Sequence, residues 1–247
     1  MKDAALEELW ATTPPSTETF SRSRITHLPT QARAYLSHTL AEGALLARAV
    51  RISMHGRIKL GEAWSPFHAT QVISWARGFV WHAHTLVKGL PVSGSDVEID
   101  GRGAMKWRIL GIVPVMEASG PEITRSAIGR LHAEAMWLPG ALLTEEVEWS
   151  DGRHGPAFTV RAHGEESHVE LRTDADGAVG ALSLLRWGDV GHPGTFGYEP
   201  FGGYASEEKT FSGVTIPTEY RIGWHFGTDR FDEGEFFRCT LDSVEYR

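Results

Sequence analysis

Apolar and polar residues alternate along much of this chain, which is the pattern of β-strands that bury one face. The stretch VRISMHG at 50–56 shows it clearly, because apolar residues occupy every second position. Turns rich in Asp and Gly separate several segments of this kind. The strand-like segments are residues 50–60, 79–87, 97–100, 105–115, 145–149, 157–163, 168–173, 178–187, 204–211, 215–224 and 235–246. The pattern predicts about ten strands, paired antiparallel.

Helical spacing replaces this alternation in a few segments. Residues 32–46 place Tyr35 and several leucines at helical spacing, and residues 126–138 are rich in helix formers and end at Pro139. We interpret residues 65–75 as a short helix lying on the sheet. So many strands with two or three helices favour an α+β fold, in which one large antiparallel sheet curls into a half-open β-barrel. The helices would lie on one face or at the mouth, and alternate strand residues would line an apolar interior.

The first 24 residues differ from the rest of the chain. A short helix is predicted at Ala4–Trp10, and the prolines and hydroxyl residues of TTPPST at 12–17 break regular structure. We therefore expect an N-terminal helix and linker over residues 1–24 and a single barrel domain over residues 25–247. The beginning of the chain has no apolar segment followed by a small-residue cleavage site, so we expect a cytoplasmic protein.

Composition and motifs argue against several classes of protein. The 247 residues carry 24 Lys and Arg against 32 Asp and Glu, and the net charge of -8 argues against nucleic acid as a partner. No apolar run approaches the ~18–20 residues of a membrane-spanning helix. The single cysteine, Cys239, excludes an intramolecular disulfide and a zinc site of several thiolates. Phosphate-loop, dinucleotide-binding and nucleophile-elbow motifs are absent, so no cofactor is expected, and the oligomeric state is left open.

The segment RLHAEAMWLP at 130–139 carries the spacing R-x-x-A-E-x-x-W-x-P. Trp149 follows an acidic strand, Arg186 lies on a later strand, and G-x-x-I-P stands at 213–217. Over residues 28–246 these features resemble a bacterial family of unknown function. The resemblance implies a shared fold, which is similar to the open barrels of periplasmic lipoprotein carriers that hold acyl chains under a helical lid. The chain departs from those carriers because it lacks an export signal. Shorter matches to the family lie at 61–64, 69–71, 78–81 and 101–105.

Glu134 is the strongest candidate for a catalytic side chain. Arg130 precedes it by four residues and Trp137 follows by three, so the three side chains share one helical face. If that face looks into the barrel, a partly desolvated Glu134 beside an indole ring suits a general acid or base. The alternative is an Arg130–Glu134 ion pair that fixes the helix against the sheet. His132 projects from another helical face, and we expect it to be a polar residue of the surface or of a groove.

His82 and His84 form an H-x-H sequence on a predicted strand. Their side chains would share one face, a geometry that metal sites use, and Glu134 would be the third ligand. The chain has 12 histidines, which makes a chance H-x-H common, and no further ligand stands at a diagnostic spacing. We therefore predict ordinary sheet histidines and no metal site.

The chain has nine tryptophans, more than a core of this size requires. Most would pack in the core or at the rim of the sheet, while two or three would face the interior beside a few polar anchors. Such a lining favours an elongated or ring-containing hydrophobic molecule. The predicted ligand-binding residues are Met54, Gln71, Trp81, Trp137, Arg186 and Trp187.

These patterns favour a protein that binds a hydrophobic small molecule inside the barrel. The alternative is a lyase, isomerase or cyclase that acts on a hydrophobic metabolite in the same cavity. Glu134 would then be the general acid or base, and Arg130 or Arg186 would hold an anionic group. A third hypothesis is a non-catalytic interaction module, which an exposed apolar patch on the sheet would favour.

Overall fold

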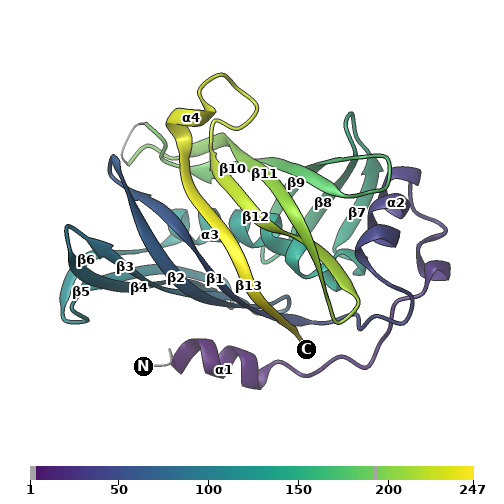
Figure 1. The fold of residues 1–247 in the computed structure, drawn as a ribbon, viewed down its shortest axis with the longest axis horizontal. Coiled ribbons are helices and arrows are strands. Elements are labelled where there is room, and N and C mark those ends of the chain that lie inside the picture. Colours follow the sequence, from purple (N-terminus) through teal and green to yellow (C-terminus); the bar gives the residue numbers. More distant parts are fainter. Residues whose placement is uncertain (1–3, 192–193) are drawn as a thin grey trace.

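One antiparallel sheet dominates the computed structural model, which describes residues 4–191 and 194–247 (Figure 1). The sheet has thirteen strands in the order β6-β5-β4-β3-β2-β1-β13-β12-β11-β10-β9-β8-β7, counted over these residues. The last strand pairs with the first, so both lie in the middle of the sheet. The predicted α+β class is confirmed. The strands are β1 (Ala49–Leu60), β2 (Ala63–Ser74), β3 (Gly78–Val87), β4 (Leu90–Ile99), β5 (Arg102–Ile109), β6 (Val113–Ser119), β7 (Val147–Asp151), β8 (Pro156–Ala162), β9 (Glu165–Thr173), β10 (Val179–Gly188), β11 (Gly197–Phe211), β12 (Val214–Trp224) and β13 (Glu235–Tyr246).

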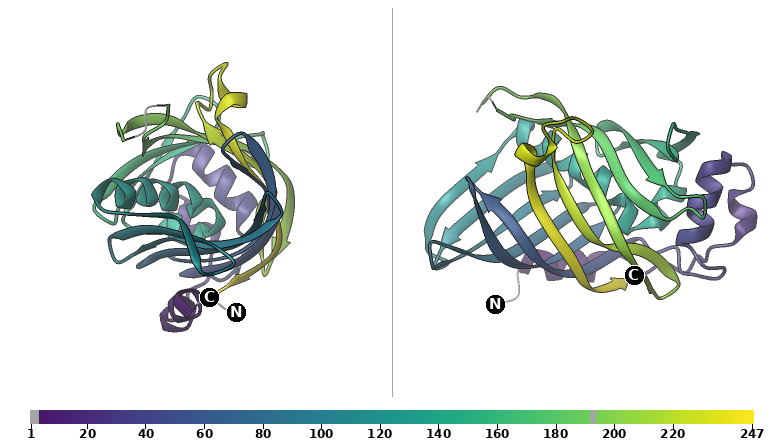
Figure 2. Two further views of the ribbon diagram at one scale, coloured as in Figure 1. Left: turned by 90° about the vertical axis from the view of Figure 1, so that its left-hand side faces the viewer. Right: turned by 45° about the horizontal axis from the view of Figure 1, so that its top comes forward.

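The sheet curls into a half-barrel, and helix α3 lies within the curl, on its open side (Figure 2). Helix α3 contacts β5 and β6 at one edge of the sheet and β9 and β10 toward the other edge. Helix α2 packs against β7 and β8, while α1 contacts β2 and β3. No helix among the described residues is long and apolar enough to cross a membrane. The helices are α1 (Ala4–Thr12), α2 (Thr30–Thr39), α3 (Pro121–Glu134) and α4 (Phe231–Gly234), with the short 3-10 helices η1 (Arg22–Ile25), η2 (Ala135–Trp137) and η3 (Pro139–Leu143).

The main hydrophobic core lies between the concave face of the sheet and the helices that cover it. Phe67 of β2, Phe158 of β8 and Leu131 of α3 belong to this core, and each is almost fully buried. The two halves of the sheet and α3 thus share one core. Burial of large apolar side chains from distant parts of the chain is the main term that stabilises such a curl.

Helix α1 covers the convex face of the sheet (Figure 1). Its Leu6 and Leu9 form a small separate cluster with valines of β2 and β3. The chain then crosses to the main core, where Phe20 is 1% exposed. Residues 1–3 of the predicted N-terminal segment lie outside the described residues. The domain boundary expected after residue 24 stays a prediction.

Residues 65–75 do not form the predicted helix, because they lie almost entirely in β2, which pairs with β1 and β3 on its two sides. Phe67, Ala69 and Gln71 are buried and occupy alternate positions, as in a strand. The end of β2 is buried on both faces, since α1 covers the convex side there. A strand that is buried on both faces loses its alternation, and local sequence then cannot separate it from a helix.

Other predicted boundaries also differ from the structure. Helix α2 ends before Leu40, which is extended and bridges to β12. Helix α3 begins at Pro121 and so starts earlier than predicted, because proline suits the first turn of a helix. Residues 105–115 divide between β5 and β6, since Leu110 and Gly111 adopt positive φ angles of 53° and 71° in the turn between them. These changes raise the number of strands above the predicted ten.

Candidate functional site

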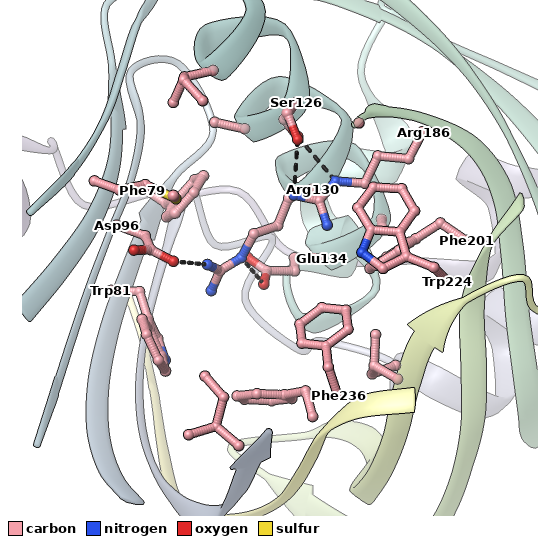
Figure 3. Close-up of a pocket in the computed structure, with 18 of the residues that line it drawn as sticks. Phe79, Trp81, Asp96, Ser126, Arg130, Glu134, Arg186, Phe201, Trp224 and Phe236 are labelled. Carbon is pink, nitrogen blue, oxygen red and sulfur yellow. Dashed lines mark hydrogen bonds and ion pairs between the residues drawn. The ribbon is translucent and has the colours of Figure 1, made fainter. Parts of the chain in front are cut away.

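A cavity of about 370 Å³ lies between the concave face of the half-barrel and α3 (Figure 3). Its lining is mostly apolar and combines side chains from strands that are distant in sequence. Helix α3 and η2 form another part of the wall, through Ala127, Ala133 and Trp137. The interior is thus apolar, as the alternation predicted. Its aromatic wall includes Phe79, Trp81, Phe201, Trp224, Phe236 and Phe237.

Four polar side chains form one hydrogen-bonded network in the wall of this cavity. Arg130 Nε donates to Glu134 Oε1 over 2.7 Å, one turn further along α3. Arg130 Nη1 donates to Asp96 Oδ2 of β4 over 3.3 Å, and Nη2 donates to Gln71 Oε1 of β2 over 3.2 Å. Gln71 Nε2 donates to Glu134 Oε2 over 2.5 Å. The network therefore ties α3 to two strands of the sheet, and Figure 3 shows the contacts of Arg130 with Asp96 and Glu134.

Each carboxylate oxygen of the network accepts a hydrogen bond. The two oxygens of Glu134 accept from Arg130 and Gln71. The remaining oxygen of Asp96, Oδ1, accepts from Trp107 Nε1 over 3.1 Å. Burial raises the pKa of Asp96, although the charge of Arg130 acts in the opposite direction. This geometry matches the second of the two predicted alternatives, an ion pair that fixes the helix against the sheet.

The Arg130 guanidinium is enclosed by aromatic rings as well as by carboxylates. It lies 4.7 Å from the ring centroid of Phe79 and 5.3 Å from that of Trp81. Burial opposes its charge, but the neighbouring carboxylates of Glu134 and Asp96 outweigh burial and raise its pKa. Arg130 is therefore a compensated cation with little capacity to bind a further anion.

Arg186 of β10 enters the cavity from the other side of α3 (Figure 3). Its Nε donates to the Ser126 carbonyl oxygen over 3.0 Å, and its Nη2 donates to Ser126 Oγ over 3.4 Å. The guanidinium lies 4.6 Å from the ring centroid of Phe201 and 5.2 Å from that of Trp224. Burial lowers the pKa of Arg186 to about 9, and the charge of Arg130 acts in the same direction.

Three of the six predicted ligand-binding residues line the cavity, namely Trp81, Trp137 and Arg186. Gln71 is fully buried and contributes through the polar network. Met54 does not line the cavity, because it is packed into the core and is 1% exposed. Trp187 does not line it either, since it follows the inward Arg186 on β10 and donates to Glu122. Its ring packs instead against the first turns of α3, where the guanidinium of Arg125 lies 4.4 Å from the ring centroid.

Sequence reasoning missed Asp96 and the aromatic residues of β11, β12 and β13. On β4 the residues nearest the interior are Gly94, Asp96 and Glu98, whereas Val97 packs with the outer cluster under α1. The usual relation is therefore reversed, because α1 buries the convex face at this point. The two-residue spacing of Asp96 and Glu98 was the available signal for an inward acidic pair.

His132 is fully buried, which corrects the expectation of a surface or groove position. Its Nδ1 lies 2.8 Å from Ser167 Oγ of β9. The reason is that α3 lies within the curl, so the sheet covers the His132 side of the helix while the Glu134 side meets the cavity. Burial lowers the pKa of His132 to about 4, and His163 adds to the effect.

His82 and His84 lie side by side on β3, with ring centroids 4.8 Å apart. Trp81 and Ala83 are the buried residues between and beside them, so the histidines occupy the face opposite the cavity. Glu134 lines the cavity and cannot join them in a metal site. Over residues 4–191 and 194–247, no group of three or more His, Cys, Asp or Glu side chains is placed to hold a metal ion.

Residues 18–236 match the model of a protein family described as "Family of unknown function (DUF6544)". A search among curated proteins finds no significant match. Among solved structures, the chain is similar to a LolA superfamily protein from Nitrosomonas europaea, with 7% identity, 81% of this chain and 86% of that chain covered, and a TM-score of 0.44.

Two other solved structures show a comparable likeness. One is a putative outer membrane lipoprotein-sorting protein domain from Vibrio parahaemolyticus, with 8% identity, coverage of 88% and 91%, and a TM-score of 0.37. The other is a DUF1329 family protein from Desulfovibrio piger, with 9% identity, coverage of 81% and 86%, and a TM-score of 0.42.

Proposed function

The chain belongs to DUF6544, a family of unknown function, and we propose that this member binds a hydrophobic small molecule in the interior of its half-barrel. The observation that carries the proposal is the cavity of about 370 Å³ with its predominantly apolar lining. Protein interiors are normally packed with few voids larger than a water molecule. Ligand sites, by contrast, are apolar cavities of roughly 300–1,000 Å³ with a few polar groups.

The alternative, a lyase, isomerase or cyclase, requires Glu134 to exchange a proton with its substrate. Both oxygens of Glu134 already accept hydrogen bonds, from Arg130 and from Gln71. A substrate would have to displace one of these donors before Glu134 acted as a base. The contacts of Glu134 therefore support a structural role, and we favour binding over catalysis.

A cavity-blocking variant tests the proposal. Ala127 lines the cavity from α3, so Ala127→Trp would place an indole in the space that a ligand needs. The probe is N-phenyl-1-naphthylamine, a neutral apolar dye that fluoresces when it leaves water. Ala11→Trp, at an exposed position of α1, is the matched control.

We expect the wild-type protein and Ala11→Trp to bind one equivalent of the dye, and Ala127→Trp to bind it at least ~10-fold more weakly. Native mass spectrometry of the freshly purified protein, followed by solvent extraction, would identify any apolar molecule that co-purifies. Failure of the wild-type protein to bind the dye, or equal binding by Ala127→Trp, would overturn the proposal.

A further inference from the structure

The cavity presents hydrogen-bond donors for which the described residues supply no acceptor. A guanidinium has five N–H donors, and Arg186 directs two of them to Ser126. The Nε1–H of Trp81, which is 2% exposed, is also without an acceptor in the described chain. In contrast, all carboxylate oxygens of Asp96 and Glu134 accept hydrogen bonds. The cavity therefore has an excess of donors over acceptors.

Of the two guanidinium groups in the cavity wall, one pairs with carboxylates at contact distance and the other does not. Arg130 lies between Asp96 and Glu134 and is neutralised at contact distance. Arg186 forms no ion pair with any carboxylate in residues 4–191 and 194–247. Asp189, the remaining carboxylate of the lining, is exposed and accepts from a backbone N–H. A partly buried cation without a contacting anion is unfavourable, and Glu134 and Asp96, which favour the charge of Arg186 from a distance, contact Arg130 instead.

The surroundings of Arg186 form a built site. Gly129 of α3 faces its side chain, and a Cβ at that position would lie 3.1 Å from Arg186 Cγ. The rings of Phe201 and Trp224 lie against its guanidinium, and the bonds to Ser126 hold the Nε and Nη2 nitrogens. Nη1 has no acceptor in the described chain, and the guanidinium is held in one orientation. Such fixed geometry suits recognition of a planar or tetrahedral oxyanion.

We propose that the ligand is an amphipathic anion whose carboxylate or phosphate group pairs with Arg186 while its hydrocarbon part occupies the apolar cavity. This inference rests on the proposed function and adds the polarity of the ligand to it. The oxyanion accepts the N–H groups that Ser126 leaves unused, and it supplies the contacting anion that Arg186 lacks. The aromatic wall of β11, β12 and β13 surrounds the hydrocarbon part.

The test compares three ligands with the same ten-carbon chain, namely decanoate, decyl phosphate and decanol. Binding of each to the wild-type protein is measured by displacement of the naphthylamine dye. Arg186→Gln removes the charge, and Arg186→Lys keeps it without the planar geometry. Arg172→Gln is the matched control, because Arg172 is exposed on the neighbouring strand β9 and lies over Tyr204.

We expect at least one of the two anions to bind the wild-type protein ~10-fold or more tightly than decanol, since a hydrogen-bonded charge contributes on that scale. Arg186→Gln should remove this preference and leave decanol binding within about twofold. Arg186→Lys should retain part of it, and Arg172→Gln should behave as the wild type. The anion that binds more tightly identifies the head group.

The experiment distinguishes failure of the anion site from failure of the proposed function. If decanol binds as tightly as both anions, or if Arg186→Gln weakens all three ligands equally, the anion site is overturned while binding of a hydrophobic molecule stands. If none of the three ligands and no dye binds, the proposed function fails and this inference fails with it. If Arg186→Gln does not fold, the wild-type preference and its reduction in Arg186→Lys decide the question.

Discussion

Glu134→Gln tests whether the polar network of Arg130, Glu134, Gln71 and Asp96 holds α3 against the sheet, a role that we call a structural lock. In the native protein, Arg130 and Gln71 each donate to one oxygen of Glu134, and Arg130 also donates to the side-chain oxygen Oε1 of Gln71. An amide at position 134 has one oxygen and one NH2 group. Either Arg130 Nε–H or Gln71 Nε2–H would then face the NH2 group, which is another donor, instead of an acceptor. The variant also leaves Arg130 with Asp96 as its contacting carboxylate.

The size of the effect follows from burial. The side chains of Arg130 and Glu134 are 17% and 13% exposed. Breaking a buried ion pair by removing one partner costs ~3–5 kcal/mol, and the remaining exposure places the expected loss near the lower end, at about 3 kcal/mol. For a chain of this size, 1 kcal/mol shifts the melting temperature by roughly 2–4 °C, so we expect a drop of about 6–12 °C.

The assay is urea denaturation of the wild type and the variant at neutral pH. Glu148→Gln is the matched control, because Glu148 pairs with Arg161 at the surface and its side chain is 73% exposed. Such surface pairs contribute ~0–1 kcal/mol. A free energy of unfolding for Glu134→Gln within about 0.5 kcal/mol of the control would refute the structural lock. Combining Glu134→Gln with Arg130→Met should cost less than the sum of the two single changes.

Three further predictions concern buried groups. Burial lowers the pKa of His132 from 6.5 to about 4, so the free energy of unfolding is unaffected by this group above pH 6.5 and falls by about 3 kcal/mol as the pH drops to 4. His132→Gln should reduce this fall, measured by urea titrations at pH 7 and pH 4. Gly94→Ala should lower the free energy of unfolding by ~1–3 kcal/mol and alter tryptophan fluorescence, since a Cβ there overlaps the Trp107 ring. Cys239 is buried and burial raises its thiol pKa, so Ellman's reagent should modify it at least ~10²-fold faster in guanidinium than in the native protein.

Specific results would contradict each of these expectations. An unchanged pH dependence in His132→Gln would show that other groups account for the acid sensitivity. Native stability in Gly94→Ala would mean that the Trp107 ring moves away at little cost. Rapid labelling of native Cys239, which lines the cavity, would show that the reagent enters the cavity in the folded protein.

The polar network shows where sequence reasoning stopped. The spacing of Arg130 and Glu134 placed them on one helical face, and their contact follows from helix geometry alone. Their other partners, Gln71 and Asp96, are 59 and 34 residues away from Arg130 in the chain. The pairing of β2 and β4 with their neighbours brings these side chains to α3, and no local pattern specifies that register.

The alternation of apolar and polar residues by itself determined that this chain forms a large antiparallel sheet with few helices, because a strand with one covered face leaves a period of two in the sequence. That pattern defines two faces of each strand without saying which face is inside. The tertiary structure decided it: α1 covers the convex face, which turns Val97 outward and Asp96 inward, and α3 lies within the curl, which buries His132. It also placed Arg186 in the apolar cavity without a carboxylate partner among the described residues, because its surroundings come from α3, β11 and β12, which only the curl of the sheet brings together.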